Sequence, residues 1–313
     1  MLSTRRSFLT GAAALAVSPA LAKAPMVETT SPVYRMKVGD FEVTAFSDGS
    51  FDGSTKLFSH IDQAEADRLL AKDFRPVGEK LRLEVNAFVV NTGDKLVLVD
   101  SGTVPGFAPT LGKFPERLAA AGYKPEAFDA IVMTHLHADH VGALTMAEGK
   151  ARFPNAEFIL SAAEMKFWWD DGIMSRAKKE DQFFFQAARG ASKPYEKAVR
   201  TFDKDGEVVK GISAVALPGH TPGHSGYLIA SGADSLLIWG DIIHSPSLQF
   251  AHPEASIVFD VDPDMAAATR RKILDRVSAD KTLIAGMHLN FPAFSHIETD
   301  GSGFSIVPDH WRL

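Results

Sequence analysis

The chain has 313 residues, 45% of them hydrophobic and 23% charged, which is the balance of a globular protein with a large core, folded as one large domain or two ordinary ones. Its formal net charge of −6 and the lack of a long basic block argue against nucleic acid as a partner and favour a small, neutral or apolar ligand. Because the chain has no cysteine, disulfides, thiolate metal ligands and a cysteine nucleophile are excluded.

The first residues have the pattern of an export signal. Two arginines at 5–6 precede an apolar run over 8–17, and small residues follow. The run is shorter than the roughly 20 residues of a membrane span, so a cleaved signal is favoured over a membrane anchor. The stretch "TRRSFL" resembles the twin-arginine signal, which implies the twin-arginine export machinery as a partner and a periplasmic location. We predict cleavage after Ala22, so that the signal covers 1–22, with Ala24 as the alternative.

Strand-like runs follow in two clusters, bounded by Gly, Asp, Asn or Pro as turns require. The first cluster is predicted at 41–47, 84–91, 95–100, 130–134 and 157–161, and the second at 212–217, 225–231, 235–240 and 282–286. Helical patterns lie at 109–121, 141–148, 162–171, 179–200 and 263–278. In the last helix an apolar face is expected from Ile273, Leu274 and Val277, with Arg270, Arg271 and Lys272 covering much of the rest.

Two strand clusters flanked by helices predict two sheets packed face to face and covered by helices. No linker divides the clusters, so we predict one domain with two halves. The segment 161–205 interrupts the strand pattern with helices and aromatic residues, and is predicted to be a helical insertion over one end of the domain.

The strongest chemical signal is "MTHLHADHVG", which follows an apolar strand and contains His135, His137, Asp139 and His140. In an extended chain, residues two apart share a face, so His135 and His137 can reach the same ion. A turn into the helix predicted at 141–148 would direct Asp139 and His140 at a second ion. Imidazole and carboxylate groups are suitable ligands for first-row metals.

Further candidate ligands lie at the ends of other strands. "LPGHTPGHS" contains His220 and His224, "WGDIIH" contains Asp241 and His244, and "AGMHLNF" contains His288. Each follows an apolar run, so we expect all of them at the sheet edge that carries "THLHADH".

In this order, "THLHADHVG", "PGHTPGHS", "WGD" and "GMH", with "LVLVDSGT" at 97–103, resemble the motifs of the metallo-β-lactamase superfamily. The resemblance covers the mature chain, 23–313, and implies an α+β fold, an αββα sandwich of two mixed β-sheets flanked by helices, with a dinuclear metal centre. It implies the following ligands: His135, His137 and His220 for one ion, Asp139, His140 and His288 for the other, and Asp241 as the bridge. The two divalent ions are expected to be Zn²⁺, with Mn²⁺, Co²⁺ and Fe²⁺ left open, and to hold an attacking hydroxide between them.

Two polar residues are expected to support the ligands. The resemblance implies that Asp100 orients the metal-binding loop, although "DSGT" fits a helix or turn cap nearly as well. His224 follows the turn "TPG" and is interpreted either as a partner of the ligands or as a structural residue.

Other stretches resemble one branch of the superfamily. "GDFEVTAFSDGSF", "AAGYKPE" and "FPAFSHI" are similar to methyl parathion hydrolases and to related lactone and aryl-ester hydrolases. This branch implies a periplasmic homodimer with an aromatic pocket over the metals. We therefore place Trp168, Phe184 or Phe185, and the alternating pair Ile257 and Phe259 at the pocket wall. For the aromatic residues, core packing is the alternative.

His244 follows Asp241 by three residues, at a position where the resemblance implies different side chains in lactonases and in organophosphate hydrolases. The resemblance implies a substrate-touching tyrosine there in quorum-quenching lactonases and an aliphatic residue in organophosphate hydrolases. A histidine can hydrogen-bond a lactone carbonyl or the developing oxyanion, or pass a proton to the leaving oxygen. In the alternative interpretation it points away and caps the strand.

We therefore predict a periplasmic dinuclear hydrolase that opens aromatic lactones such as dihydrocoumarin, or acyl-homoserine lactones, with side activity on activated aryl esters and phosphotriesters. Asp241 and His244 are the predicted catalytic residues. The alternative enzyme is an organophosphate triesterase. A metal-binding or sensing protein with an inactive site is the alternative from another class, and the complete ligand set argues against it.

Overall fold

The computed structural model describes residues 32–104 and 106–310. The predicted export signal over 1–22 lies outside these residues. In the described part of the chain, no helix combines the length and the apolar character that crossing a bilayer requires.

Within residues 32–104 and 106–310, fourteen strands form two seven-stranded sheets, and both sheets are mixed. The first has the order β1-β2-β3-β4-β5-β6-β7: β1 Val33–Val38, β2 Phe41–Ser54, β3 Lys80–Asn91, β4 Leu96–Val99, β5 Ala130–Val132, β6 Glu157–Ser161 and β7 Val199–Phe202. The second has the order β14-β13-β12-β11-β10-β9-β8: β8 Gly206–Val209, β9 Ile212–Ala216, β10 Ser225–Ser231, β11 Asp234–Ile238, β12 Leu283–Ala285, β13 Phe294–Asp300 and β14 Gly303–Pro308. The two strand clusters predicted from the sequence are therefore two separate sheets.

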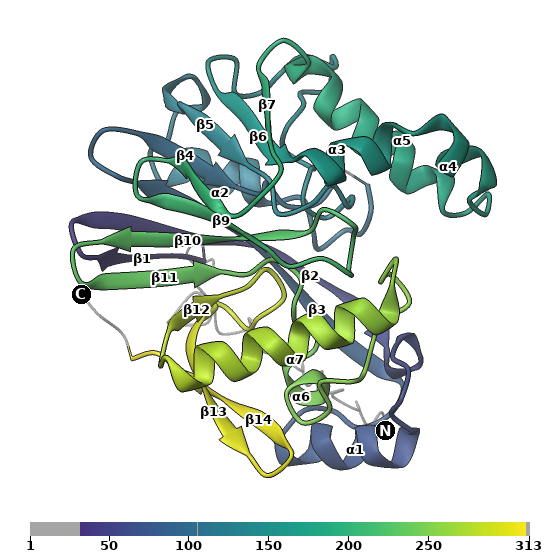
Figure 1. Cartoon of the computed structure of the whole chain (residues 1–313). Helices are drawn as coiled ribbons and strands as arrows, with labels where there is room; N and C mark the ends of the chain where they lie inside the picture. Colours follow the sequence, from purple (N-terminus) through teal and green to yellow (C-terminus); the bar gives the residue numbers. More distant parts are fainter. Residues whose placement is uncertain (1–31, 105, 311–313) are drawn as a thin grey trace, which may run out of the picture. The chain divides into compact units, whose positions relative to one another are not determined.

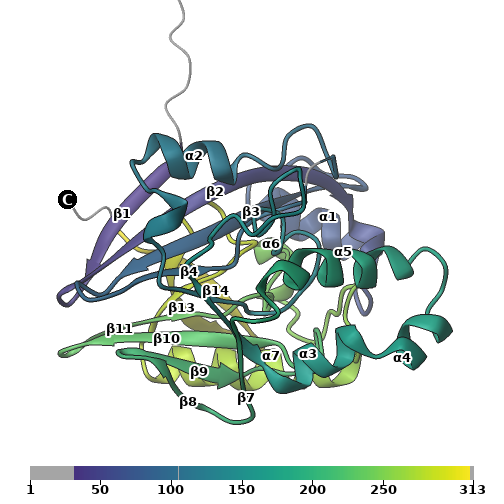
Figure 2. The same cartoon turned by 90° about the horizontal axis from the view of Figure 1, so that it is seen from above.

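Helices lie on the outer faces of the two sheets and at one end of them (Figure 1 and Figure 2). They are α1 Gln63–Lys72, α2 Phe114–Ala120, α3 Ala162–Trp169, α4 Asp171–Arg176, α5 Gln182–Ser192, α6 Pro246–Gln249 and α7 Pro263–Ala279, with short 3-10 turns at Thr55–Leu57, Pro125–Ala127 and Lys193–Tyr195. Figure 1 shows α7 lying along the second sheet, and Figure 2 shows α2 outside the first sheet and α7 outside the second. The layers are those of an αββα sandwich, as predicted.

Apolar side chains between the sheets explain this layering. Strand β1 buries Tyr34, Met36 and Val38 on one face and leaves the residues between them more exposed, as expected of an edge strand with one covered face. Strands β4 and β5 are buried along nearly their whole length, because both of their faces are covered. Each fully buried large apolar side chain contributes about 1.5–3 kcal/mol to folding, so this core holds the sheets together without disulfides.

The structure corrects several predicted elements. Strands β1, β7, β8, β13 and β14 and helices α1, α4 and α6 were not predicted, and the helix expected over 109–121 is only α2. The helix expected over 179–200 is α5, and residues 199–202 form β7 at the edge of the first sheet. The helical part of the segment 161–205 is therefore α3, α4 and α5.

The helix predicted at 141–148 is wrong, because this segment consists of turns. Its backbone groups form hydrogen bonds with the loop that follows β4 and not with one another in a helix. The N–H of Gly142 donates to the carbonyl of Gly102 (2.7 Å), and the carbonyl of His140 accepts from Ser101 N–H (2.7 Å). A Cβ on Gly142 would lie 1.9 Å from the carbonyl of Thr103, so only glycine permits this close approach.

Parallel strand pairs bring the polar loops to one edge. Strand β4 is parallel to β5 in the first sheet, and β11 is parallel to β12 in the second. The loops that follow these four strands carry Asp100, the "THLHADH" motif, Asp241 and His288, respectively. The carboxyl ends of parallel neighbours meet at the same edge, which is where polar sites form in such sheets.

Candidate metal centre

Three histidines from two loops converge at this edge. His135 and His137 follow β5, and His220 lies in the loop between β9 and β10. The Nδ1 atom of His137 lies 3.0 Å from His135 Nε2 and 2.9 Å from His220 Nε2. All three side chains are buried. The three residues that the resemblance implies for one ion therefore lie together, although His220 is more than 80 positions from the other two.

A second group forms beside the first. Asp139 lies 3.7 Å from His140 and 3.6 Å from His288, measured between the nearest carboxylate oxygen and Nε2 of each histidine. The backbone turns here because the N–H of His140 donates to the carbonyl of His137 (3.0 Å). This turn brings Asp139 and His140 to the side of His288, with the His140 ring 4.0 Å from that of His135, and no helix follows as had been predicted.

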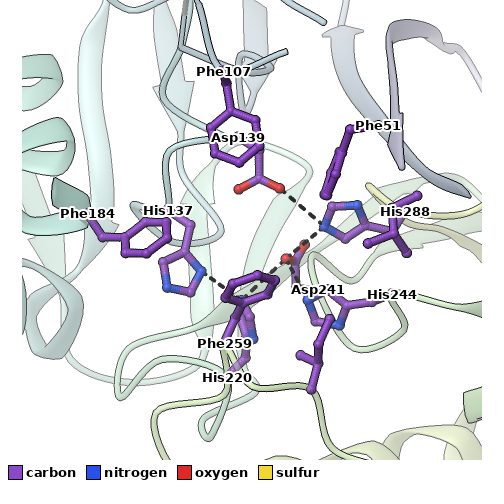
Figure 3. Close-up of a pocket in the computed structure, with 12 residues that line it drawn as sticks. Phe51, Phe107, His137, Asp139, Phe184, His220, Asp241, His244, Phe259 and His288 are labelled. Carbon is purple, nitrogen blue, oxygen red and sulfur yellow. Dashed lines mark hydrogen bonds and ion pairs between the residues drawn. The ribbon is translucent and has the colours of Figure 1, made fainter. Parts of the chain in front are cut away.

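Asp241 joins the two groups (Figure 3). Its side chain is 2% exposed, and five histidine Nε2 atoms surround its Oδ2 atom: His288 at 3.0 Å, His244 at 3.2 Å, His140 and His220 at 3.3 Å and His135 at 3.7 Å. Burial alone would raise the pKa of this carboxyl group. The histidines, His140 foremost, instead hold its pKa well below the ordinary range.

The donor set fits divalent cations. The ligand atoms are imidazole nitrogens and carboxylate oxygens, and each three-residue group places them within 4.8 Å of one another. Within the described residues, the buried atoms His140 Nε2 and Asp241 Oδ1 have no hydrogen-bond partner, although such atoms are normally satisfied. The Nδ1 atom of His137 meets one nitrogen of His135 and one of His220, and a single ring nitrogen has only one proton or one lone pair to offer, whereas a cation can bind all three. A dinuclear centre satisfies all of these groups.

The protonation of the histidines follows from their neighbours. Burial and the adjacent imidazoles lower the pKa of His135 and His137 well below the usual value. Burial opposes protonation of His220 as well, but Asp241 and Asp260 raise its pKa to about 9. Because an imidazole must be neutral to coordinate, metal binding competes with protons at such a residue.

Asp100 and His224 lie behind the candidate ligands and form hydrogen bonds with them or with their backbone. Asp100 Oδ2 lies 2.7 Å from His140 Nδ1 and accepts a hydrogen bond from the Thr134 hydroxyl (2.6 Å). The Nε2 atom of His224 accepts from the backbone N–H of Asp241 (2.9 Å), while Nδ1 donates to the carbonyl of Leu217 (2.8 Å). Both residues therefore fix the orientation of residues in the candidate centre.

The sequence did not reveal Asp260 and Arg270. Asp260 Oδ1 lies 2.7 Å from His220 Nδ1, and Asp260 Oδ2 lies 3.6 Å from a terminal guanidinium nitrogen of Arg270. Arg270 was expected on the exposed face of its helix but is 1% exposed, and donates to the backbone carbonyls of Ile242, Pro253 and Ala255. The "VFDVDP" stretch offered an acid near the pocket wall, but nothing in it indicated a histidine partner 40 residues away.

His244 faces the candidate centre. Besides its contact with Asp241, its ring stacks on that of His288, with centroids 4.9 Å apart and an interplanar angle of 21°. Burial lowers its pKa to about 4, partly opposed by Asp241. The backbone N–H of His244 donates to Gln249 Oε1 (2.7 Å), so the strand end is capped by another residue and the imidazole is left for the site.

Apolar walls surround the centre (Figure 3). A narrow cavity of about 40 Å³ lies directly over the ligands, and a wider one of about 410 Å³ lies beside it. Of the predicted wall residues, Phe184, Ile257 and Phe259 line the narrow cavity, while Trp168, Phe185, Phe184 and Phe259 line the wide one. Phe51, Leu83 and Phe107 also line the narrow cavity and were not predicted, because they lie in segments without a recognisable pocket motif.

Comparison with known proteins identifies similar chains. The sequence profile of the Metallo-beta-lactamase superfamily matches residues 82–288. An N-acyl homoserine lactonase from Bacillus cereus is 23% identical over 259 residues, which cover 74% of this chain and 89% of that protein.

Two solved structures are similar over most of their length. The hydrolase AbOPH, described as in the beta lactamase superfamily, is 34% identical, with 91% of this chain and 100% of that chain covered and a TM-score of 0.86. AidC, a dizinc quorum-quenching lactonase in complex with a product, is 25% identical, with 90% and 99% covered and a TM-score of 0.84.

Proposed function

This chain belongs to the metallo-β-lactamase superfamily, and from that premise we propose that it is a dinuclear metal hydrolase that opens lactones. The observation that carries the proposal is the position of His244, a polar side chain beside a complete set of ligands in a cavity whose other walls are largely apolar. The lactonase names of AidC and of the Bacillus cereus relative support the same substrate class.

The proposed ligands are those that the resemblance implies, and the geometry brings them together; it also groups His244 with His220 and Asp241, and Asp100 with His135 and His140. His135, His137 and His220 would hold one ion, Asp139, His140 and His288 the other, and Asp241 would bridge them. When bound, two divalent ions supply an activated water and polarise the ester carbonyl. We propose zinc, because AidC is a dizinc enzyme and the ligands are nitrogen and oxygen atoms; manganese, cobalt and iron suit the same atoms.

The residues of the chain have separate tasks in this proposal. Phe184, Ile257 and Phe259 hold an apolar ring and exclude water from the reacting bond. His244 is neutral at neutral pH, so its imidazole has one N–H to donate and one nitrogen that accepts. It would hydrogen-bond the carbonyl oxygen or pass a proton to the leaving oxygen.

The narrow cavity favours a flat ring over a bulky triester. Its volume is about 40 Å³, and Phe184 and Phe259 line both this cavity and the wide one beside it. A phosphotriester with two alkoxy arms would require a larger opening. Activated aryl esters, which are also planar at the reacting carbon, are the proposed secondary substrates.

A substrate panel tests the proposal. The purified protein, loaded with zinc, is assayed with dihydrocoumarin, an acyl-homoserine lactone, an activated aryl ester and methyl parathion. We expect the highest kcat/KM for a lactone. A much higher kcat/KM for methyl parathion would establish the organophosphate triesterase instead, and metal binding without turnover of any ester would indicate an inactive binding protein.

We further propose that the protein is exported through the twin-arginine pathway to the periplasm and acts there as a homodimer. The support is the paired arginines at 5–6, the short apolar run after them and the resemblance to a periplasmic, dimeric branch. Replacing both arginines by lysine should retain the protein in the cytoplasm, as fractionation would show. A monomer in light scattering of the purified protein would contradict the dimer.

A further inference from the structure

Glu164 is a fully buried acid in the first turn of α3, and the functional proposal above gives it no role. Its two oxygens accept four hydrogen bonds. Oε1 accepts from the backbone N–H of Leu136 (3.0 Å) and from the indole N–H of Trp168 (2.6 Å). Oε2 accepts from the hydroxyl of Thr221 (2.5 Å) and the backbone N–H of Gly223 (3.1 Å). All four partners are donors, which is the environment that a carboxylate requires.

The partners of Glu164 are chain neighbours of the candidate ligands. Leu136 lies between His135 and His137, and Thr221 directly follows His220. One loop leaves the first sheet and the other belongs to the second sheet. Glu164 belongs to a third segment, so a single carboxylate joins the two loops whose three histidines form one metal group.

The second loop packs directly against α3. A Cβ placed on Gly223 would lie 2.1 Å from the backbone nitrogen of Glu164, which leaves no room for any other residue there. The loop can therefore approach α3 only through its glycine, and the carboxylate fixes the distance by hydrogen bonds. This close packing is evidence, separate from the hydrogen bonds, that the position of the His220 loop depends on α3.

The same carboxylate reaches the pocket wall. Trp168, one of its donors, packs its ring edge-on against His137, with centroids 5.3 Å apart, and lines the wide cavity. A shift of Glu164 would move the aromatic wall and the histidine together.

We propose that Glu164 is a positioning residue that sets the separation of the His135–His137 loop from the His220 loop, and that α3 is for this reason part of the metal centre. This inference rests on the dinuclear centre of the proposed function. It adds that the ion held by His135, His137 and His220 depends on Glu164, whereas the ion held by Asp139, His140 and His288 does not.

The test is metal retention by the E164Q variant. Glutamine keeps the size of the side chain, but its NH₂ group cannot accept, so one of the two donor pairs loses its acceptor. Titrating metal-free protein with Co²⁺ while recording the visible spectrum and the bound stoichiometry, we expect one of two ions to bind about 10- to 100-fold more weakly. The other ion should bind as in the wild type.

To identify which ion is affected, E164Q is combined with H220A and, separately, with H288A. In an H220A protein, E164Q should cause no further loss, because the dependent ion is already impaired. In an H288A protein, E164Q should weaken the ion that remains. Equal losses in the two backgrounds would overturn the proposal, as would wild-type binding of both ions by the single E164Q variant.

Smaller changes keep the proposal falsifiable if E164Q does not fold. T221V removes one donor to Glu164 and should weaken the same ion, while T221S keeps the hydroxyl and should restore binding. W169F is the matched control on the same helix, because the indole of Trp169 donates to Ser192 (3.3 Å) and not to Glu164.

A wild-type protein that binds fewer than two ions would contradict the dinuclear centre itself, and normal ion binding by T221V would contradict only the role of Glu164.

Discussion

At the scale of single residues, charge compensation dominates the site. Asp241 is an acid at the end of an apolar strand, and five histidines lie within 3.7 Å of one of its oxygens. An isolated buried carboxylate would be strongly destabilising, so such an arrangement persists only where cations or protons compensate it. His244 differs from the other four because the resemblance assigns it no metal, and it still points at the same carboxylate.

Replacing His244 tests its proposed contact with substrate. His244→Leu should lower kcat/KM for the preferred lactone by about 100-fold, because it removes a hydrogen bond to charge that develops in the transition state. Steady-state kinetics with bound metal measured in the same samples is the required experiment. His296→Leu, in β13, is the control and should leave the kinetics unchanged. Unchanged lactone turnover in the His244 variant would remove this residue from the mechanism.

At the scale of elements, α7 supports the site by an inward-facing arginine. Asp262 caps the helix by accepting from the N–H of Met265 (3.0 Å), and Pro263 occupies its first turn. Arg270 then projects into the core and donates to the backbone carbonyls of Ile242, next to Asp241, and of Pro253 and Ala255, in the segment that leads to Ile257. The helix therefore connects the Asp241 loop, the pocket wall and Asp260.

Removing this arginine should destabilise the fold. Arg270→Met leaves the buried carbonyls of Ile242 and Pro253 without their donor and removes the positive charge beside Asp260, which should lower the free energy of unfolding by about 3–5 kcal/mol. Urea unfolding of the metal-free protein measures it. Lys272→Met, on the exposed side of the same helix, is the matched control and should change stability by no more than about 0.5 kcal/mol. If both substitutions changed the free energy of unfolding equally, Arg270 would contribute no more to stability than an exposed residue of the same helix.

At the scale of the whole molecule, the centre joins the two halves of the sandwich. His135, His137 and His140 come from the first sheet, and His220, Asp241 and His288 come from the second. Ions held by both groups would therefore cross-link the sheets at this edge, so metal binding is expected to be coupled to stability.

Metal removal tests this coupling. Dialysis against a chelator should lower the melting temperature, and adding Zn²⁺ back should restore it. At a free metal concentration of 100 times Kd, metal binding should raise the free energy of unfolding by about 2.7 kcal/mol per site. Calorimetry over a series of metal concentrations measures it. A melting temperature independent of metal would mean that the ions do not cross-link the sheets.

The sequence by itself determined the chemistry of the site and the class of fold. The ligand types, their places after apolar strands and the two strand clusters are local patterns, because hydrophobic periodicity and the spacing of polar residues are properties of a short stretch of chain. The edge strand β14 was missed because its apolar pattern is irregular, whereas β1 alternates regularly and could have been recognised from its sequence.

Only the tertiary structure decided which buried polar groups meet. Asp260 beside His220, Arg270 inside the core, Glu164 between two histidine loops and the direction of His244 all depend on partners distant in the sequence. The turns at 141–148 have the same cause, since backbone groups that could have formed a helix are bonded to the loop after β4. A polar group that is removed from water must find a partner, and that partner is chosen by packing and not by sequence distance.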